Sequence, residues 1–193
     1  MSLLTLMEGL AEAKIRVVLV GGMAVRVHGV LRSTDDVDVC YDGGYLNERA
    51  LVSLLREWNA YPRGAAPGRP FRFSRKELSL NDTCRLQTVH GYLVLMREVP
   101  GVGTYGDIIA HADTFRMPGG LALPVISVEK LIRAKEFAGR EKDEVVLLEL
   151  RAVRALKLAR ESGLDDLQPG AGPSAPSTEP TPKRPAPKRG RGR

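Results

Sequence analysis

Two aspartates that alternate with valines constrain this chain more than any other feature of its sequence. Residues 36–41 read Asp-Val-Asp-Val-Cys-Tyr, and on a β-strand alternate side chains share one face. Asp36 and Asp38 are therefore expected to project together, with Val37 and Val39 turned toward a core. Two carboxylates about 7 Å apart along a strand repel each other unless a cation lies between them. Mg²⁺, which takes one or two carboxylates plus substrate phosphates, is the expected occupant.

A glycine pair lies upstream of this strand. Arg16–Val20 is a short β-branched run that ends at Gly21-Gly22, and Met23–His28 is expected to be a short helix. Where a strand turns into a helix, free N–H groups and the helix dipole favour a phosphate, and glycine lets a ligand approach the backbone. The same pair is also typical of a plain turn. No Lys-Ser or Lys-Thr follows it, which excludes a P-loop.

The rest of the chain predicts helices mixed with strands. In chain order we expect helices at Leu3–Lys14 and Asn47–Trp58, a Pro/Gly loop over 60–70, strands at Phe71–Phe73, Thr83–Val89 and Tyr92–Met96, a helix at Tyr105–His111, a hairpin over Phe115–Val125, and helices from Ser127 to Phe137 and from about Glu141 to Glu161. This mixture predicts an α+β fold, with a small mixed β-sheet flanked by helices.

The order of strand, glycine pair, short helix and Asp-x-Asp strand resembles the minimal nucleotidyltransferase fold of the DNA polymerase β-like superfamily. Its form here, VGGMAVRVHGVLRSTDDVDV over residues 20–39, is most similar to the bacterial AbiEii and MenT-type nucleotidyltransferase toxins. The resemblance implies that Gly21 and Gly22 hold a triphosphate and that Asp36 and Asp38 bind Mg²⁺. Arg32, Ser33 and Thr34 precede the aspartates and are further candidates for nucleotide binding, although Ser33 and Thr34 could instead shape the start of the strand.

A second segment, residues 127–143, resembles the basic helix block of the same toxin-like family. Lys135 and Arg140 beside a carboxylate pair would supply cations for the phosphates of a nucleotide. Asp143 could orient one of these cations or receive a proton, so Lys135 and Asp143 join the aspartate pair as candidate catalytic residues. The alternative is an exposed helix whose charges pair with one another.

One expected group is missing. Superfamily members commonly carry a third carboxylate on a neighbouring strand of the form Gly-x-Leu-Asp-Leu-Leu, but here Gly91–Met96 has Val94 in place of the aspartate. A valine neither ligates a metal nor accepts a proton from an attacking hydroxyl. Either Asp82, Glu98 or Asp143 takes that role, or the enzyme is weakened or inactive.

The high net charge belongs to the end of the chain. Residues 169–193 contain six basic residues and one acid, so they carry +5 of the net charge of +6. They also hold seven of the 13 prolines and no Leu, Ile, Val or aromatic residue, which predicts a disordered basic Pro/Gly-rich tail. We expect a nucleotidyltransferase-like domain over 1–168, with a helical C-terminal part at 127–163. The tail either aids solubility or tethers a polyanion such as RNA.

Cysteine use and hydropathy suggest a cytoplasmic protein. Cys40 and Cys84 are the only cysteines, too few for a disulfide scaffold or a zinc site. No apolar run approaches the roughly 20 residues of a membrane span, and the first residues lack a basic leader, so neither a membrane segment nor a signal peptide is expected. His28 and Cys40 are expected as packed residues, although Cys40 faces as the aspartates do and could border the site.

These patterns predict a Mg²⁺-dependent nucleotidyltransferase that moves a nucleoside monophosphate from a nucleoside triphosphate to an acceptor hydroxyl. The resemblance implies an RNA end (tRNA) or a protein as the acceptor, and the toxin branch implies an antitoxin protein as a partner. The alternative is a catalytically degenerate protein of the same fold that binds a nucleotide, RNA or a partner protein without chemistry.

Overall fold

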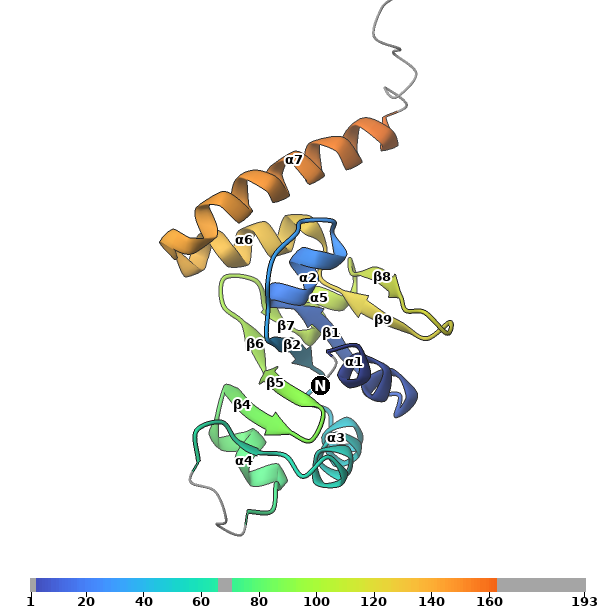
Figure 1. Ribbon diagram of the computed structural model, residues 1–193, viewed down its shortest axis with the longest axis vertical. Helices are drawn as coiled ribbons and strands as arrows, with labels where there is room; N and C mark the ends of the chain where they lie inside the picture. The colour runs from blue at the N-terminus through green and yellow to red at the C-terminus, as the bar shows by residue number, and fades with distance from the viewer. Residues whose placement is uncertain (1–2, 66–70, 163–193) are drawn as a thin grey trace, which may run out of the picture.

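A mixed sheet of seven strands organises the computed structural model, which describes residues 3–65 and 71–162 (Figure 1). The strand order is β3-β4-β5-β2-β1-β9-β8. The bounds are β1 Val17–Val20, β2 Asp36–Tyr41, β3 Tyr61–Pro62, β4 Thr83–Thr88, β5 Gly91–Met96, β8 Asp113–Arg116 and β9 Ala122–Val125. The β2–β5 and β1–β9 pairs are parallel, and the other neighbouring strands pair antiparallel.

Helices lie on the sheet and beyond its edges. They are α1 Leu3–Glu12, α2 Gly21–Val27, α3 Tyr45–Glu57, α4 Arg75–Leu80, α5 Tyr105–Ile109, α6 Val128–Ala138 and α7 Glu144–Glu161, with a 3₁₀ turn at Glu141–Asp143. Helix α1 contacts β2, β5 and β9, while α2 contacts α6. The α+β class with a mixed sheet flanked by helices is therefore confirmed.

The alternation in β2 separates the core from a polar face. Val37 and Val39 are completely buried, whereas Asp36 and Asp38 are partly exposed. Trp58 belongs to the same core, because a β-carbon on Gly9 of α1 would lie only 2.5 Å from its ring. The hydrophobic core thus forces both aspartates onto the opposite face of the sheet, as the alternation predicts.

Four local features differ from the expectations. Strand β3 lies within residues 60–70, which were expected to form a loop, and pairs with β4. Phe71–Phe73 is not a strand, and the residues that follow form α4, which the sequence analysis missed. This helix begins at a capping box, in which the Glu77 carboxylate accepts a hydrogen bond from the Ser74 N–H at 2.9 Å. A short pairing of β6 Glu98–Val99 with β7 Gly103–Thr104 was also not foreseen. Helix α2 begins at Gly21 rather than at residue 23.

The C-terminal helices follow the prediction closely. The Ser127 hydroxyl accepts a hydrogen bond from the Lys130 N–H at 3.4 Å and caps α6, and Gly139 ends that helix with a φ of 56°. The expected final helix begins one turn late, after the 3₁₀ turn. The expected tail over 169–193 lies outside the described residues. Among residues 3–65 and 71–162, no helix is both long and apolar enough to span a membrane.

Candidate active site

Asp38 packs directly against the glycine turn. Val20, the last residue of β1, pairs with Asp38 of β2, which sets the carboxylate beside the start of α2. Gly21 has a φ of +61°, and a β-carbon there would lie 2.0 Å from Asp38 Oδ2. The Gly22 N–H donates a long hydrogen bond of 3.4 Å to the same oxygen. Only glycine fits at position 21, because the turn must leave room for this carboxylate.

Thr34 links the glycine turn to the second aspartate. A β-carbon on Gly22 would lie 2.5 Å from Thr34 Oγ1. The same hydroxyl donates a hydrogen bond of 3.1 Å to Asp36 Oδ1. Arg63 Nη1 lies 3.7 Å from Asp36 Oδ2 on the other side. The glycine pair, Thr34 and both aspartates therefore form one packed unit.

Burial and a neighbouring carboxylate together raise the pKa of Asp38. Burial raises the pKa of this carboxyl to about 6, and the nearby negative charge of Asp36 adds to the rise. The Gly22 N–H and the cations of Lys135 and Arg85 lower the pKa, but they do not cancel the increase. A cation between the two carboxylates would relieve their repulsion.

Lys135 and Asp143 form an ion pair opposite the aspartates. Lys135 Nζ lies 2.8 Å from Asp143 Oδ1, and both side chains are largely buried. Arg32 supports the same corner, because its Nη1 donates to the Lys142 carbonyl oxygen at 3.3 Å and its Nη2 lies 3.9 Å from Asp143 Oδ1. The loop before β2 is thereby tied to the start of α7.

The site residues named from the sequence lie around one pocket of about 380 Å³. They are Gly21, Gly22, Arg32, Ser33, Thr34, Asp36, Asp38, Lys135, Arg140 and Asp143. Six basic and four acidic side chains line this pocket. Such a lining suits an anionic ligand held together with a cation.

Arg85 and Arg63 also line the pocket and were missed in the sequence analysis. Arg85 of β4 pairs with Val94 of β5, and Val94 pairs with Asp38 of β2. Because paired residues on neighbouring strands share a face, these three side chains lie in one row. Arg63 also stacks on Tyr92, with its guanidinium carbon 4.0 Å from the ring centroid. Arg85 enters the pocket through its register opposite Val94, which the structure reveals.

The row of Asp38, Val94 and Arg85 across β2, β5 and β4 contains one carboxylate, that of Asp38. Val94 is 4% exposed and lies between Asp38 and Arg85. The side chain beyond Val94 in this row is therefore basic rather than acidic. Of the acids considered as substitutes, Asp143 lines the pocket, whereas Asp82 and Glu98 do not. Asp143 is already engaged by Lys135.

Asp36 and Asp38 fit a divalent cation that completes its coordination elsewhere. No group of three or more His, Cys, Asp or Glu side chains within the described ranges could hold a metal on its own. Two carboxylates on one face, one of them with a raised pKa, nevertheless form the kind of incomplete site that Mg²⁺ shares with waters and phosphate oxygens.

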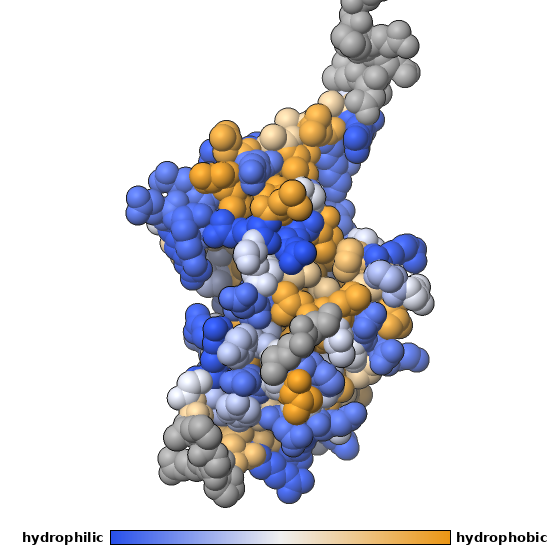
Figure 2. Space-filling model, in the orientation of Figure 1, coloured by the Kyte–Doolittle hydropathy of each residue, from blue (hydrophilic) through white to orange (hydrophobic). Residues whose placement is uncertain are grey.

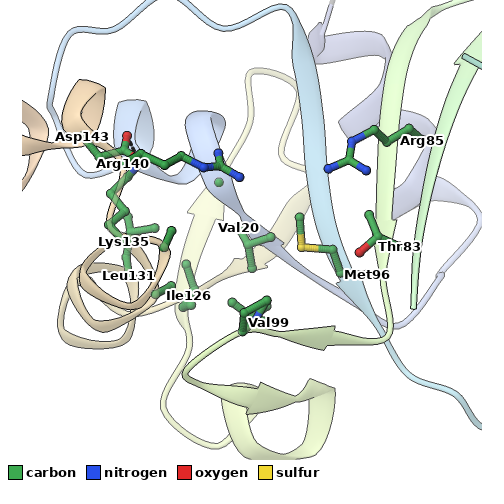
Figure 3. Close-up of a pocket in the computed structure, with 14 residues that line it drawn as sticks. Val20, Thr83, Arg85, Met96, Val99, Ile126, Leu131, Lys135, Arg140 and Asp143 are labelled. Carbon is green, nitrogen blue, oxygen red and sulfur yellow. Dashed lines mark hydrogen bonds and ion pairs between the residues drawn. The ribbon is translucent and has the colours of Figure 1, made fainter. Parts of the chain in front are cut away.

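An apolar pocket of about 200 Å³ opens beside the polar one (Figure 3). Its apolar lining comes from β1, β5 and α6 and from the segments next to them: Val20, Met96, Val99, Pro100, Ile126, Leu131, Ala134 and Ala138. Figure 3 shows Arg85 and Arg140 reaching toward each other from opposite sides of its rim. Six residues line both pockets: Gly21, Arg85, Met96, Lys135, Arg140 and Asp143. A ligand of the polar pocket could therefore extend an apolar group into this one.

Cys40 and His28 have structural contacts outside the site. Cys40 is completely buried, and burial raises the pKa of its thiol to about 12. The His28 Nε2 lies 2.8 Å from the Ile126 carbonyl oxygen, which ties α2 to the segment before α6. Neither residue lines the polar pocket.

Comparisons with known proteins give structural likenesses only. No family model matches the chain, and no curated protein is similar enough to be matched. The crystal structure of the lincosamide antibiotic adenylyltransferase LnuA with lincomycin bound is 16% identical, covers 78% of this chain and 95% of its own, and has a TM-score of 0.49. The solution structure of the antibiotic-resistance factor ANT(2'')-Ia is 14% identical, covers 82% and 90%, and has a TM-score of 0.42. The crystal structure of ANT(2'')-Ia with adenylyl-2''-tobramycin is 13% identical, covers 80% and 94%, and has a TM-score of 0.44. Likeness at this level does not establish a function.

Proposed function

We propose that this protein is a nucleotidyltransferase of the DNA polymerase β-like superfamily, which transfers a nucleoside monophosphate from a nucleoside triphosphate to an acceptor hydroxyl. A single observation carries the proposal. Asp36 and Asp38 share one pocket with the glycine turn and with the cations Lys135, Arg140 and Arg85. Carboxylates for a metal and cations for phosphates are the two requirements of phosphoryl-type transfer, which depends mainly on positioning and charge stabilisation.

The triphosphate would lie between the glycine turn and α6. The Gly22 N–H belongs to the first turn of α2, and Lys135 approaches from the other side of the pocket. Asp143 holds the Lys135 ammonium at 2.8 Å, and this contact would orient Lys135 toward the phosphates. Arg32 and Arg140 would neutralise further phosphate charge at the pocket mouth.

Asp36 and Asp38 would hold Mg²⁺, which, when bound, would polarise the α-phosphoryl group and stabilise the charge that develops there. Thr34 and the Gly22 N–H keep the two carboxylates oriented through their hydrogen bonds. The negative charge of Asp36 contributes to the raised pKa of Asp38, and a cation between the two carboxylates would relieve that repulsion.

The acceptor would enter along β4 and β5, where Val94 replaces the expected acid. With no free carboxylate at that place, the pocket offers Arg85 and an apolar wall instead. This lining favours a hydroxyl carried by a neutral or anionic molecule, and the end of an RNA satisfies that requirement. The resemblance of residues 20–39 to nucleotidyltransferase toxins supports a toxin role, with an antitoxin protein as partner.

A second function is favoured by Val94 and Arg85 together. A protein that has the glycine turn, the aspartate pair and the cations of the polar pocket, but lacks an acid to activate the acceptor, would bind the Mg²⁺–nucleotide complex without transfer. The polar pocket would then recognise a nucleotide, and nucleotide binding would have a regulatory role.

Incubation with each α-labelled nucleoside triphosphate, total RNA and Mg²⁺ tests the proposal. Label on RNA or protein that is lost in Asp36→Asn and retained in Asp35→Asn supports transfer. Asp35 is a matched control, because it lines the same pocket but is exposed and has the opposite strand parity. Mg²⁺-dependent nucleotide binding without label on any acceptor supports the second function. Absence of nucleotide binding contradicts both.

A further inference from the structure

Helix α7 carries a second apolar face that no described residue covers. Its first face packs on the core through Val146 and Leu150, which are 2% and 0% exposed. On the other side Val145, Leu148 and Leu156 are 68%, 70% and 61% exposed. Ala152 and Ala155 on that side are also exposed. Figure 2 shows several orange, apolar patches over α7 with blue residues between them.

The exposed residues and the half-buried Ala159 form one continuous stripe. Val145, Leu148, Ala152, Ala155, Leu156 and Ala159 follow one another at helical spacings and lie within about 120° of the helix circumference. We call these six residues the outer stripe. The spacing is that of a helix seam that packs against another helix. Helix α7 is 18 residues long, which gives the stripe a length of about 20 Å between its end residues.

The outer stripes of two copies are complementary when their α7 helices run antiparallel. With Ala152 at the centre, Leu148 of one copy faces Leu156 of a second copy, and Val145 faces Ala159. The small central residue lets two helices approach closely, while the larger residues fill the space on either side. This pattern matches an isologous interface about a two-fold axis.

The distribution of charge along α7 agrees with antiparallel packing. Residues 144–150 contain two acids and no base, whereas residues 151–161 contain four bases and one acid. Two of these bases, Arg151 and Lys157, also pair with Glu136 and Asp113 of the same chain. Antiparallel packing sets the acidic half of one helix beside the basic half of the other, and parallel packing would set like charges together. The helix dipoles also favour the antiparallel arrangement.

We propose that two copies of this chain associate through antiparallel packing of their α7 helices on the outer stripe, with Ala152 at the two-fold axis. The residues of the stripe do not line either pocket of the active site. The proposal therefore stands apart from the proposed transferase activity. Packing at the outer stripe would hold α7 in place. Because Asp143 at the start of α7 contacts both Lys135 and Arg32, the same packing would also hold these contacts in place. The interface is small, so we expect association in the micromolar range.

Sedimentation of the full chain over a range of concentrations tests the association. We expect the 21.1 kDa chain to reach twice its mass in a concentration-dependent manner. Ala152→Glu and Ala152→Lys should each weaken association at least tenfold, because two like charges would meet at the axis, and an equimolar mixture of the two variants should restore it. Leu158→Glu is the matched control, because Leu158 is an exposed leucine of α7 outside the stripe, and it should leave association unchanged.

The orientation has its own readout. Val145→Cys mixed with Ala159→Cys should cross-link the two copies under oxidation, and Val145→Cys alone should not. The native cysteines do not interfere, since both are buried. A wild-type chain that stays monomeric throughout overturns the proposal, and so does association that survives Ala152→Glu. Cross-linking by Val145→Cys alone overturns the antiparallel arrangement. A monomer whose stripe cysteines are protected from reagents would show that another segment of this chain covers the stripe, which also overturns the proposal.

Discussion

The Lys135 ammonium and the Asp143 carboxylate meet at 2.8 Å inside the pocket that also contains the aspartate pair, and they come from two different helical segments. The pair joins the end of α6 to the start of α7. It also fixes the cation that faces Asp38, whose pKa Lys135 helps to lower. The Lys135–Asp143 ion pair therefore links the stability of the fold to the proposed activity.

Removal of one partner of this pair should be costly. Asp143→Ala leaves a largely buried ammonium without its carboxylate, and we expect a loss of about 2–4 kcal/mol in the free energy of unfolding. Lys135→Met with Asp143→Leu should lose less than the two single variants predict together, because neither charge is then left alone. Urea denaturation of the four proteins gives the coupling energy. Additive losses would mean that the contact contributes nothing.

Gly21→Ala should destabilise the protein more than Gly29→Ala does. Both glycines have a positive φ, of +61° and +92°, and an alanine in such a conformation costs roughly 1–2 kcal/mol. An added β-carbon has nothing within 4 Å at position 29, whereas at position 21 it would meet the Asp38 carboxylate. The excess loss of stability at position 21 measures the contact between the glycine turn and Asp38. Equal losses in chemical denaturation would show that the carboxylate does not require the glycine.

Asp38→Asn should stabilise the metal-free protein above pH 6. The folded-state pKa of about 6 lies above the unfolded value of 3.8, so the folded state binds more protons between these values and stability falls as the pH rises. A tenfold change in a proton-binding constant corresponds to about 1.4 kcal/mol, so the gain at pH 8 can reach about 3 kcal/mol. The gain should vanish near pH 4. Thermal melts in a chelator across this pH range provide the check, with Asp35→Asn as the control. A gain that does not depend on pH would contradict the assigned electrostatic origin.

Arg85→Met should weaken nucleotide binding by about tenfold, or roughly 1.4 kcal/mol, because it removes a cation from both pockets. Arg133→Met is the matched control, since Arg133 is an exposed arginine of α6 that lines neither pocket. The salt dependence of binding should also decrease in the Arg85 variant. Unchanged affinity and salt dependence would remove Arg85 from the ligand site.

The aspartate pair could be predicted from sequence because its position depends on local alternation alone. Val37 and Val39 must enter the core, and this requirement places Asp36 and Asp38 on the same face. The α4 helix was missed because its signal is a four-residue capping box, which follows a Phe-Arg-Phe run that imitates a strand.

Arg85 could not be placed from sequence because its position depends on the register of a hairpin. A turn was expected at His90-Gly91. The N–H groups of both residues donate hydrogen bonds to the Thr88 hydroxyl, and β5 already begins at Gly91. This turn sets Arg85 opposite Val94. Long-range register of this kind is fixed by tertiary packing and turn geometry together. Lys135 and Asp143 were identified through a resemblance, since their meeting depends on how two helices are joined.

Calorimetric titration of a non-hydrolysable nucleoside triphosphate into the wild type, Asp38→Asn and Asp35→Asn, with and without Mg²⁺, tests most directly whether the carboxylate pair holds a metal–phosphate complex. We predict that wild type and Asp35→Asn bind the nucleotide only with Mg²⁺, and that Asp38→Asn binds it at least ten times more weakly. Equal affinity in all three proteins, or wild-type binding that is unchanged by removal of Mg²⁺, would contradict the proposed site.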